Sequence, residues 1–289
     1  MKTNASKLPV KSVLGQVAQA QGAPFWNMAM DKDGRGHPMV CGGGITYNFK
    51  VGDCCMGIAG DRVEPGVCTC NTGDPAVSGA YSNFSCVGNK AVVLSGDAKG
   101  AVGTVVGKTV GAGRASNVIL HFDDETLHKL SGDDRFRIES CGFGLRLSDY
   151  PDVEARSLSP KLLEVMGIEE RDGKLFVPVA KVIPPELISS GLGGTAFGGD
   201  CDMSTLEGDE YWQEYQDLRF GDIVLIQDID TTLGRTFQRG AVTIGVVSHG
   251  DSIELGYGPG ITTLLAAKND VLQGVLCKDA NIANYLGLK

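Results

Sequence analysis

Alternating apolar and polar residues are clearest between residues 89 and 124. The run NKAVVLSGDAKGAVGTVVGKT, followed by NVILHFDD, reads as strand, glycine turn, strand, loop, strand. In the last segment Val118, Leu120 and Phe122 fall on one face of a strand. Ile119 and His121 fall on the other face, so this period of two predicts β-structure.

Two longer apolar runs nearer the C-terminus predict buried strands. They are DIVLIQDID, residues 222–230, and RGAVTIGVVSHGD, residues 239–251. In the second run the alternation places Thr243, Gly245, Val247 and His249 on one face. We therefore expect His249 to lie where a buried strand leaves the core, with Gly245 leaving room beside it.

Helix signals are sparse and predict three short helices. Ser159 as N-cap, Pro160 in the first turn and Gly167 past the end define one. IPPELISSGLGG predicts a second that stops at Gly191, and GDEYWQEYQDLRFGD a third that ends near Leu218. Glycine occupies 41 of 289 positions, about twice its usual share, so turns and bulges should be frequent. The sequence predicts a β-dominated α+β fold with barrel-like sheets and a few short helices.

The pattern divides the chain into three regions. Residues 1–88 are a loop-rich β region, residues 89–150 a small barrel segment, and residues 151–289 a mixed α/β region. No linker separates them, and we expect all three to form one compact unit.

Charge restricts the partners. The formal net charge is −9, which repels phosphate backbones and anionic lipid, so neither nucleic acid nor a membrane is expected as a partner. The N-terminal segment MKTNASKLPVKSVLGQ lacks the apolar core of a secretion signal. We expect a cytoplasmic protein that acts on a small-molecule substrate; self-association into a homo-oligomer stays open.

The nine cysteines contain no C-x-x-C spacing, which zinc and cluster sites commonly use. We expect them to be mostly free thiols in a reducing compartment.

Candidate metal ligands occur in pairs with one residue between them. Asp200 and Asp202 lie in GGTAFGGDCDM and would point the same way in an extended segment. His249 and Asp251 repeat the spacing in TIGVVSHGDS. Carboxylates and an imidazole suit a divalent metal ion, so these four residues are the predicted ligands. The alternative is that the aspartates form turns and that Asp251 is the fixed partner of a buried His249.

Three other residues are candidates for catalysis. His37 precedes a run of glycines, and Asp61 and Glu64 precede a Pro-Gly turn. The two carboxylates could serve as general bases; the alternative is that they lie on the surface beside the turn. Asp228 and Asp230 follow a predicted strand with the same pair spacing.

Several motifs resemble known families. Val93, Gly96, Lys99, Gly100, Gly103 and Val105 resemble the KOW motif of small SH3-like barrels. That resemblance implies a barrel element, and the acidic net charge argues against the RNA binding of KOW domains.

Longer stretches, namely CGGGITYNFKVGD, AGDRVEPGV, FGGDCDM, LRFGDIVLIQDID, GRTFQRGAVTIGVVSHGDS and GYGPGITTLL, resemble a family of uncharacterised bacterial proteins known as a domain of unknown function. The segment 198–202 also resembles, more weakly, the GGNMD motif of the acetamidase/formamidase family, with Asp202 as the matching acidic residue. This weaker resemblance implies metal-dependent hydrolysis of a small amide. SHGDSIE supplies His249 and Asp251 but departs from the spacing of that family's later motif.

Two functions stay open at this point. One is a metal-dependent hydrolase of a small amide or other C–N bond that uses water activated by a divalent metal. The other is a non-catalytic ligand-binding or assembly protein with the barrel as its interface.

Overall fold

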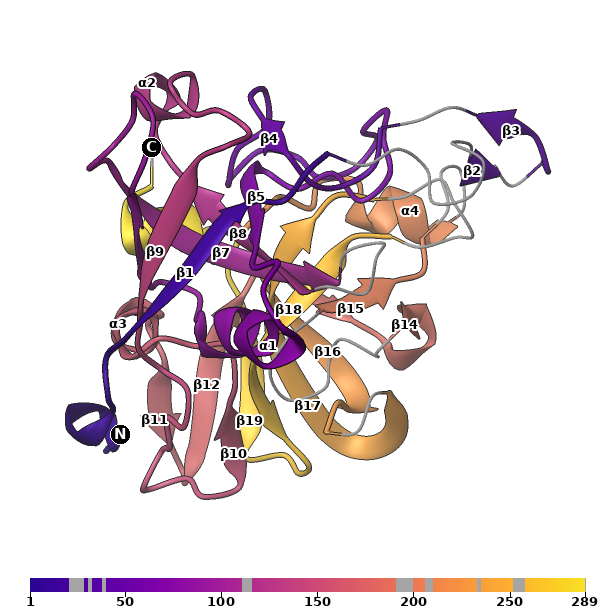
Figure 1. Ribbon diagram of the computed structural model, residues 1–289. Coiled ribbons are helices and arrows are strands. Elements are labelled where there is room, and N and C mark those ends of the chain that lie inside the picture. The colour runs from indigo at the N-terminus through magenta and orange to yellow at the C-terminus, as the bar shows by residue number, and fades with distance from the viewer. Residues whose placement is uncertain are drawn as a thin grey trace.

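The computed structural model describes residues 1–20, 29–30, 33–37, 40–110, 116–190, 200–205, 210–232, 235–251 and 258–288. Its strands far outnumber its short helices, which confirms the predicted β-dominated fold with barrel-like sheets (Figure 1). All nine cysteines are free thiols, as predicted.

The first half of the chain forms a closed antiparallel barrel. Its strands follow the order β1-β9-β6-β7-β8-β5, and β1 pairs back onto β5 to close the ring. The bounds are β1 (Lys11–Val17), β5 (Gly66–Cys70), β6 (Lys90–Val93), β7 (Val102–Val110), β8 (Ser116–His121) and β9 (Arg135–Ser140), with β4 (Ile45–Thr46) added beside β5. The KOW-like segment supplies β6 and β7, while β1 and β5 come from the region before it.

The alternation predicted for residues 117–122 is confirmed. Val118 and Leu120 belong to the core cluster inside the barrel, with Val67 and Phe136. Ile119 belongs to a different cluster, shared with the second half of the chain. The outer face of β8 is therefore also buried.

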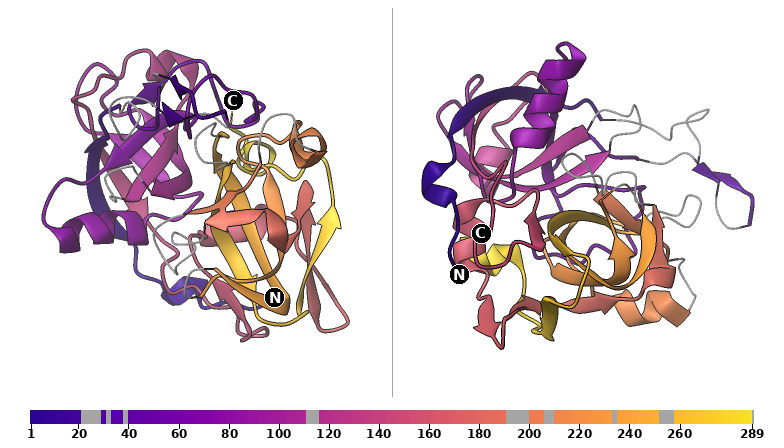
Figure 2. Two further views of the ribbon diagram at one scale, coloured as in Figure 1. Left: turned by 90° about the vertical axis from the view of Figure 1, so that its right-hand side faces the viewer. Right: turned by 90° about the horizontal axis from the view of Figure 1, so that it is seen from below.

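The second half forms another curved sheet, of order β13-β16-β17-β18-β15-β14, with β10 also paired to β18. The bounds are β10 (Val153–Ala155), β13 (Lys181–Ile183), β14 (Ile188–Ser190), β15 (Asp200–Met203), β16 (Ile223–Asp230), β17 (Thr236–His249) and β18 (Gly260–Ala267). The two sheets form neighbouring lobes (Figure 2). They meet where β7 packs against β15, β17 and β18.

Smaller elements complete the fold. They are the sheet β11 (Glu169–Arg171), β12 (Lys174–Val179) and β19 (Leu272–Leu276), the pair β2 (Ala29–Met30) and β3 (Gly36–His37), the helices α1 (Pro75–Phe84), α2 (Asp124–Leu127), α3 (Pro160–Val165), α4 (Glu210–Tyr215) and α5 (Ile282–Leu286), and the 3-10 turns η1 (Ala5–Lys7) and η2 (Pro185–Leu187). Across the described ranges, none of these helices has the length and apolarity needed to cross a bilayer.

The helix predictions succeed where capping chemistry is explicit. Ser159 accepts a hydrogen bond from the backbone N–H of Leu162 and starts α3 as predicted. The helix predicted over IPPELISSGLGG is wrong: only the turn η2 forms, and the chain then enters β14. The β-branched residue that follows η2, Ile188, instead pairs with Met203 of β15.

Candidate metal centre

Three neighbouring strands of the second sheet bring two carboxylates and an imidazole together. Gly260 of β18 lies opposite Asp202 of β15 on one side and opposite His249 of β17 on the other. Asp200 lies opposite Thr262, two residues along the same face. The predicted extended conformation of Asp200–Met203 is confirmed, and it points both aspartates the same way.

The cluster is tight and buried. His249 Nε2 is 2.8 Å from Asp200 Oδ2 and 3.1 Å from Asp202 Oδ1. One ligand atom from each residue lies within 4.8 Å of the others. Cys201, between the aspartates, belongs instead to an apolar cluster on the other face, and burial raises its pKa to about 12. It is therefore not placed to supply a thiolate ligand.

Hydrogen bonds fix the state of the imidazole. Nδ1 lies 2.7 Å from the carbonyl oxygen of Gly250. Because a carbonyl oxygen can only accept, Nδ1 carries a proton and donates a hydrogen bond to it. Burial by itself lowers the pKa of His249, but the hydrogen bonds and charges of Asp200 and Asp202 outweigh burial and raise it to about 10. Nε2 therefore also carries a proton when only the two carboxylates face it.

The carboxyl group of Asp202 responds to the same environment. Burial raises its pKa, and the charge of Asp200 raises it further, while His249 and Arg62 act in the opposite direction. A divalent cation would relieve this crowding of negative charge.

Gly260 makes room for the cluster. A Cβ at this position would lie 2.0 Å from His249 Nε2 and 2.5 Å from Asp200 Oδ2. Because residue 260 has no side chain, the three polar groups can converge in the space that a Cβ would occupy. This glycine lies in GYGPGITTLL, and no local pattern in that segment distinguishes it from the glycines around it.

A β-bulge turns His249 toward the aspartates. Val247 pairs with Ile261 and His249 pairs with Gly260, so Ser248 is an extra residue in β17. Val247 packs with Ile261 in an apolar cluster, whereas His249 points to the opposite face. The prediction that Val247 and His249 share a face is therefore wrong. Gly245 likewise makes room for Ile261, whose Cγ2 would lie 2.3 Å from an added Cβ, and not for the histidine.

The loop carrying two predicted catalytic residues lies beside this strand end. The backbone N–H of Gly250 donates to Val63 O at 2.9 Å. Glu64 accepts hydrogen bonds from Gly43 N–H at 2.9 Å and from the Thr109 hydroxyl at 3.2 Å. Asp61 is completely buried. Both carboxylates are thus interior groups, and neither lies on an exposed turn.

Asp251, the fourth predicted ligand, has other partners than the cluster. Asp251 accepts hydrogen bonds from the backbone N–H groups of Gly57, at 2.8 Å, and Ile58, at 3.4 Å. Burial raises the pKa of Asp251, and these hydrogen bonds lower it in part. His37 is in β3, and its side chain lies outside the described part of the chain. The four glycines of the range 193–199 also lie outside it.

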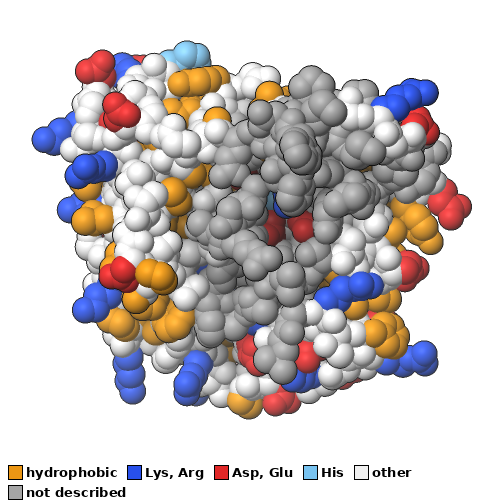
Figure 3. All heavy atoms as spheres, turned by 45° about the vertical axis from the view of Figure 1, so that its right-hand side comes forward, with side chains coloured by type: hydrophobic (Ala, Val, Ile, Leu, Met, Phe, Trp, Pro, Cys, Tyr) orange, Lys and Arg blue, Asp and Glu red, His pale blue; other side chains and the backbone are white. Residues whose placement is uncertain are grey.

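The cluster lies at the junction of the two lobes. The backbone N–H of Lys108, in β7, donates to Thr262 Oγ1 at 2.9 Å, and that hydroxyl donates to Lys108 O at 2.9 Å. Thr262 is the residue opposite Asp200. Figure 3 shows acidic and basic side chains near the centre of one face of the molecule.

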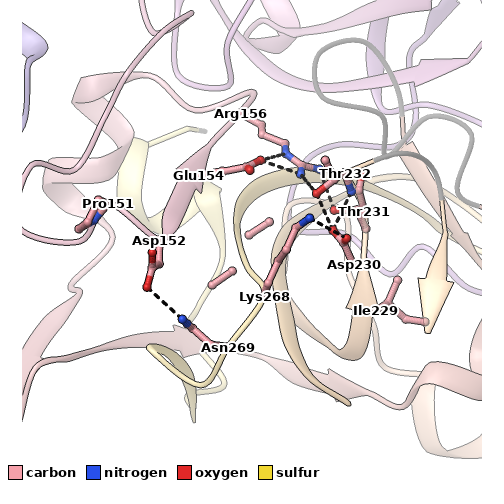
Figure 4. Close-up of a pocket in the computed structure, with 12 residues that line it drawn as sticks. Pro151, Asp152, Glu154, Arg156, Ile229, Asp230, Thr231, Thr232, Lys268 and Asn269 are labelled. Carbon is pink, nitrogen blue, oxygen red and sulfur yellow. Dashed lines mark hydrogen bonds and ion pairs between the residues drawn. The ribbon is translucent and has the colours of Figure 1, made fainter. Parts of the chain in front are cut away.

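A separate cavity of about 300 Å³ contains Asp230 (Figure 4). Its charged groups pair with one another: Lys268 Nζ is 3.2 Å from Asp230 Oδ2, and Arg156 donates to Glu154 at 2.9 Å. Asp228 instead accepts a hydrogen bond from the backbone N–H of Gly240 at 2.6 Å. The pair Asp228 and Asp230 thus shares the spacing of Asp200 and Asp202 without sharing their convergence.

Comparisons with known proteins identify relatives along the whole chain. The model for "Domain of unknown function (DUF4438), N-terminal" matches residues 28–164, and its C-terminal counterpart matches residues 165–286. The crystal structure of TM1086 is 37% identical in sequence, superposes with a TM-score of 0.90, and the match covers 99% of each chain. No curated protein matches this sequence. The resemblance to acetamidase/formamidase finds no support in these comparisons.

Proposed function

Because the chain belongs to the DUF4438 family, a domain of unknown function, we propose its activity from the site: a metal-dependent hydrolase of a small amide or other C–N bond. The observation that supports this most strongly is the convergence of His249 Nε2 with one oxygen each of Asp200 and Asp202.

The donor set fits a first-row divalent ion such as zinc. Imidazole nitrogen and carboxylate oxygen are both ordinary zinc ligands, and three protein ligands leave positions for water and substrate. Metal-binding histidines usually donate their other ring N–H to a carbonyl or carboxylate, as His249 does to Gly250. When bound, such an ion polarises a carbonyl group and makes water nucleophilic near neutral pH.

We assign Glu64 as the general base. Its loop is held next to His249 through the Val63–Gly250 hydrogen bond, and donors from Gly43 and Thr109 orient its carboxylate. In the reaction, the water oxygen bonds to the carbonyl carbon and the C–N bond breaks. One water proton passes through Glu64 to the leaving nitrogen, which gives a carboxylic acid and an amine.

The first test is metal binding. We expect isothermal titration with Zn²⁺ to give one site in the metal-free wild type. Asp202→Asn and His249→Gln should weaken that site by about 100-fold or more, since each removes a ligand. Asp230→Asn is the matched control. Asp230 has the same spacing from Asp228 as Asp202 has from Asp200, but it lines the separate cavity and lies outside the cluster. Equal zinc affinity in all four proteins would exclude this metal site.

The second test is turnover. Zinc-loaded protein should release amine or ammonia from some members of a panel of small amides. Glu64→Gln should lose about 100-fold or more in rate while it keeps its zinc affinity, because a general base contributes roughly that factor. Unchanged turnover in Glu64→Gln would remove its role as base, and an inactive panel with zinc bound would favour a binding protein.

A further inference from the structure

Arg62, next to the cluster, has an unfavourable backbone conformation. Its φ is +50°, and the only other described non-glycine residues with positive φ are Asp172 and Asp228. Asp172 lies in the β11–β12 turn, and Asp228 lies at a register shift in β16. Aspartate tolerates this region of φ more readily than arginine does. Strain of this kind persists only where the surrounding structure imposes it, and it concentrates at functional sites.

The end of β17 imposes this conformation. The backbone N–H of Arg62 donates to Asp251 O at 3.1 Å, and the next residue, Val63, accepts from Gly250 at 2.9 Å. On the other side, Asp61 N–H donates to Val40 O at 2.7 Å. Arg62 is thus fixed against the two residues that follow His249.

The side chain of Arg62 is a cation close to the cluster. Its Nε is 3.7 Å from Asp61 Oδ2, and the side chain is 27% exposed while Asp61 is completely buried. Its charge acts on Asp202, where it opposes the effects of burial and of Asp200. The guanidinium is therefore partly exposed, pairs with a buried carboxylate and lies within electrostatic reach of the proposed metal ligands.

Two positive groups would lie beside Asp200 and Asp202 once a metal is bound, namely the ion itself and the guanidinium of Arg62. A divalent ion would offset Asp200 and Asp202, and Asp61 offsets Arg62. A substrate anion could then reach both the metal and a guanidinium, whose planar donors match a carboxylate in bidentate fashion.

We infer that Arg62 binds an anionic group of the substrate, so that the preferred substrates are small amides bearing a carboxylate, such as N-acyl amino acids. This inference rests on the proposed metal-dependent function. It adds a residue that selects the substrate and does not itself carry out the bond cleavage.

Malonate and acetate are suitable probes, because only malonate has a second carboxylate for Arg62. With zinc-loaded protein, we expect Arg62→Gln to weaken malonate binding by about 10-fold or more and acetate binding by less than about 3-fold. Arg62→Lys should recover only part of the malonate affinity, since an ammonium lacks the bidentate fork. Arg146→Gln, at an exposed arginine between β9 and β10, is the control and should bind both as the wild type does.

A second variant separates binding from folding. Arg62→Gly loses the ion pair with Asp61, as Arg62→Gln does, but it can adopt a positive φ without strain. It should therefore melt no lower than Arg62→Gln, keep its zinc affinity and still lose malonate affinity. Wild-type malonate affinity in Arg62→Gln and Arg62→Gly, with zinc still bound, would overturn the role of Arg62. Failure of the wild type to bind zinc would instead overturn the proposed function, and the inference with it.

Discussion

At the scale of single residues, one absent side chain allows the site to form. Gly260 lies between Asp202 and His249 in the strand register. Any other residue at this position of β18 would project a Cβ into the space where the three polar groups meet. The cluster depends on this glycine as directly as on its ligands.

Gly260→Ala should therefore disrupt the site. The added Cβ would lie 2.0 Å from His249 Nε2, so the imidazole and Asp200 must move apart, and we expect zinc binding to be lost. Stability should fall by roughly 1–3 kcal/mol, as is usual for overpacking a buried position. Zinc titration and chemical denaturation measure the two effects.

Gly79→Ala is the matched control for this substitution. Gly79 lies in α1 with nothing within 4 Å of an added Cβ. Its replacement should leave zinc binding intact and change stability by about 0.5–1 kcal/mol in the favourable direction, because alanine is the better helix former. Full zinc affinity in Gly260→Ala would show that the cluster tolerates the methyl group and would contradict the argument.

The sequence patterns predicted the acidic members of the cluster more readily than the residues that accommodate them. Asp200 and Asp202 were predictable, because their spacing aligns two carboxylates in any extended segment. The room left by Gly260 and the positive φ of Arg62 were not predictable, because they depend on strand register and backbone torsion. A glycine among other glycines, and an arginine inside a loop, leave no trace of either property in a single sequence.

At the scale of elements, β7 belongs to the barrel and packs against three strands of the second sheet. Val105 packs inside the barrel, and Val106 packs in the cluster shared with the second half of the chain. Gly107 allows close approach, since an added Cβ would lie 2.6 Å from Ser248 Cβ in β17. Lys108 is completely buried on this strand, opposite Val118 of the barrel core.

The burial of Lys108 predicts a pH dependence of stability. Burial lowers its pKa to about 8 in the folded protein, while the unfolded chain keeps the usual value near 10.4. Between these values the unfolded state binds more protons, so stability rises with pH. The Lys108 contribution to the free energy of unfolding should increase by about 2 kcal/mol from pH 7 to pH 9.5.

Urea denaturation of the wild type and Lys108→Met across this pH range provides the measurement. Met keeps the length and apolar character of the side chain but cannot titrate. As the pH rises, the free energy of unfolding of the wild type should increase relative to that of Lys108→Met. A difference that stays constant with pH would show that Lys108 keeps an ordinary pKa.

Local signals predicted elements only where the local chemistry was decisive. The cap formed by Ser159 defined α3 correctly. The same kind of signal at Asp74, which accepts hydrogen bonds from Ala76 and Val77, would have revealed α1 in a region interpreted as loops and strands. Bulges such as the one at Ser248 escaped prediction because they are set by pairing with a distant strand.

At the scale of the whole molecule, one apolar cluster is shared by the two halves of the chain. A single apolar cluster contains Val106 and Ile119 from the barrel together with Ile223, Val246 and Leu264 from the second sheet. The candidate metal centre lies along the same junction, next to β7. Which strands meet at this junction depends on long-range pairing that no local pattern encodes.

This arrangement predicts that the protein unfolds in one step and that zinc stabilises it as a whole. Separating the lobes would expose the shared cluster, so calorimetry should give a single transition whose calorimetric and van't Hoff enthalpies agree.

Zinc at a free concentration 100 times its Kd should add about 2.7 kcal/mol to the free energy of unfolding, or roughly 5 °C to the melting temperature. Asp202→Asn should keep the single transition and lose the shift with zinc, since it removes a ligand but leaves the junction intact. Two separate transitions, or a zinc shift confined to one of them, would show that the lobes fold independently and that the centre belongs to the second sheet alone.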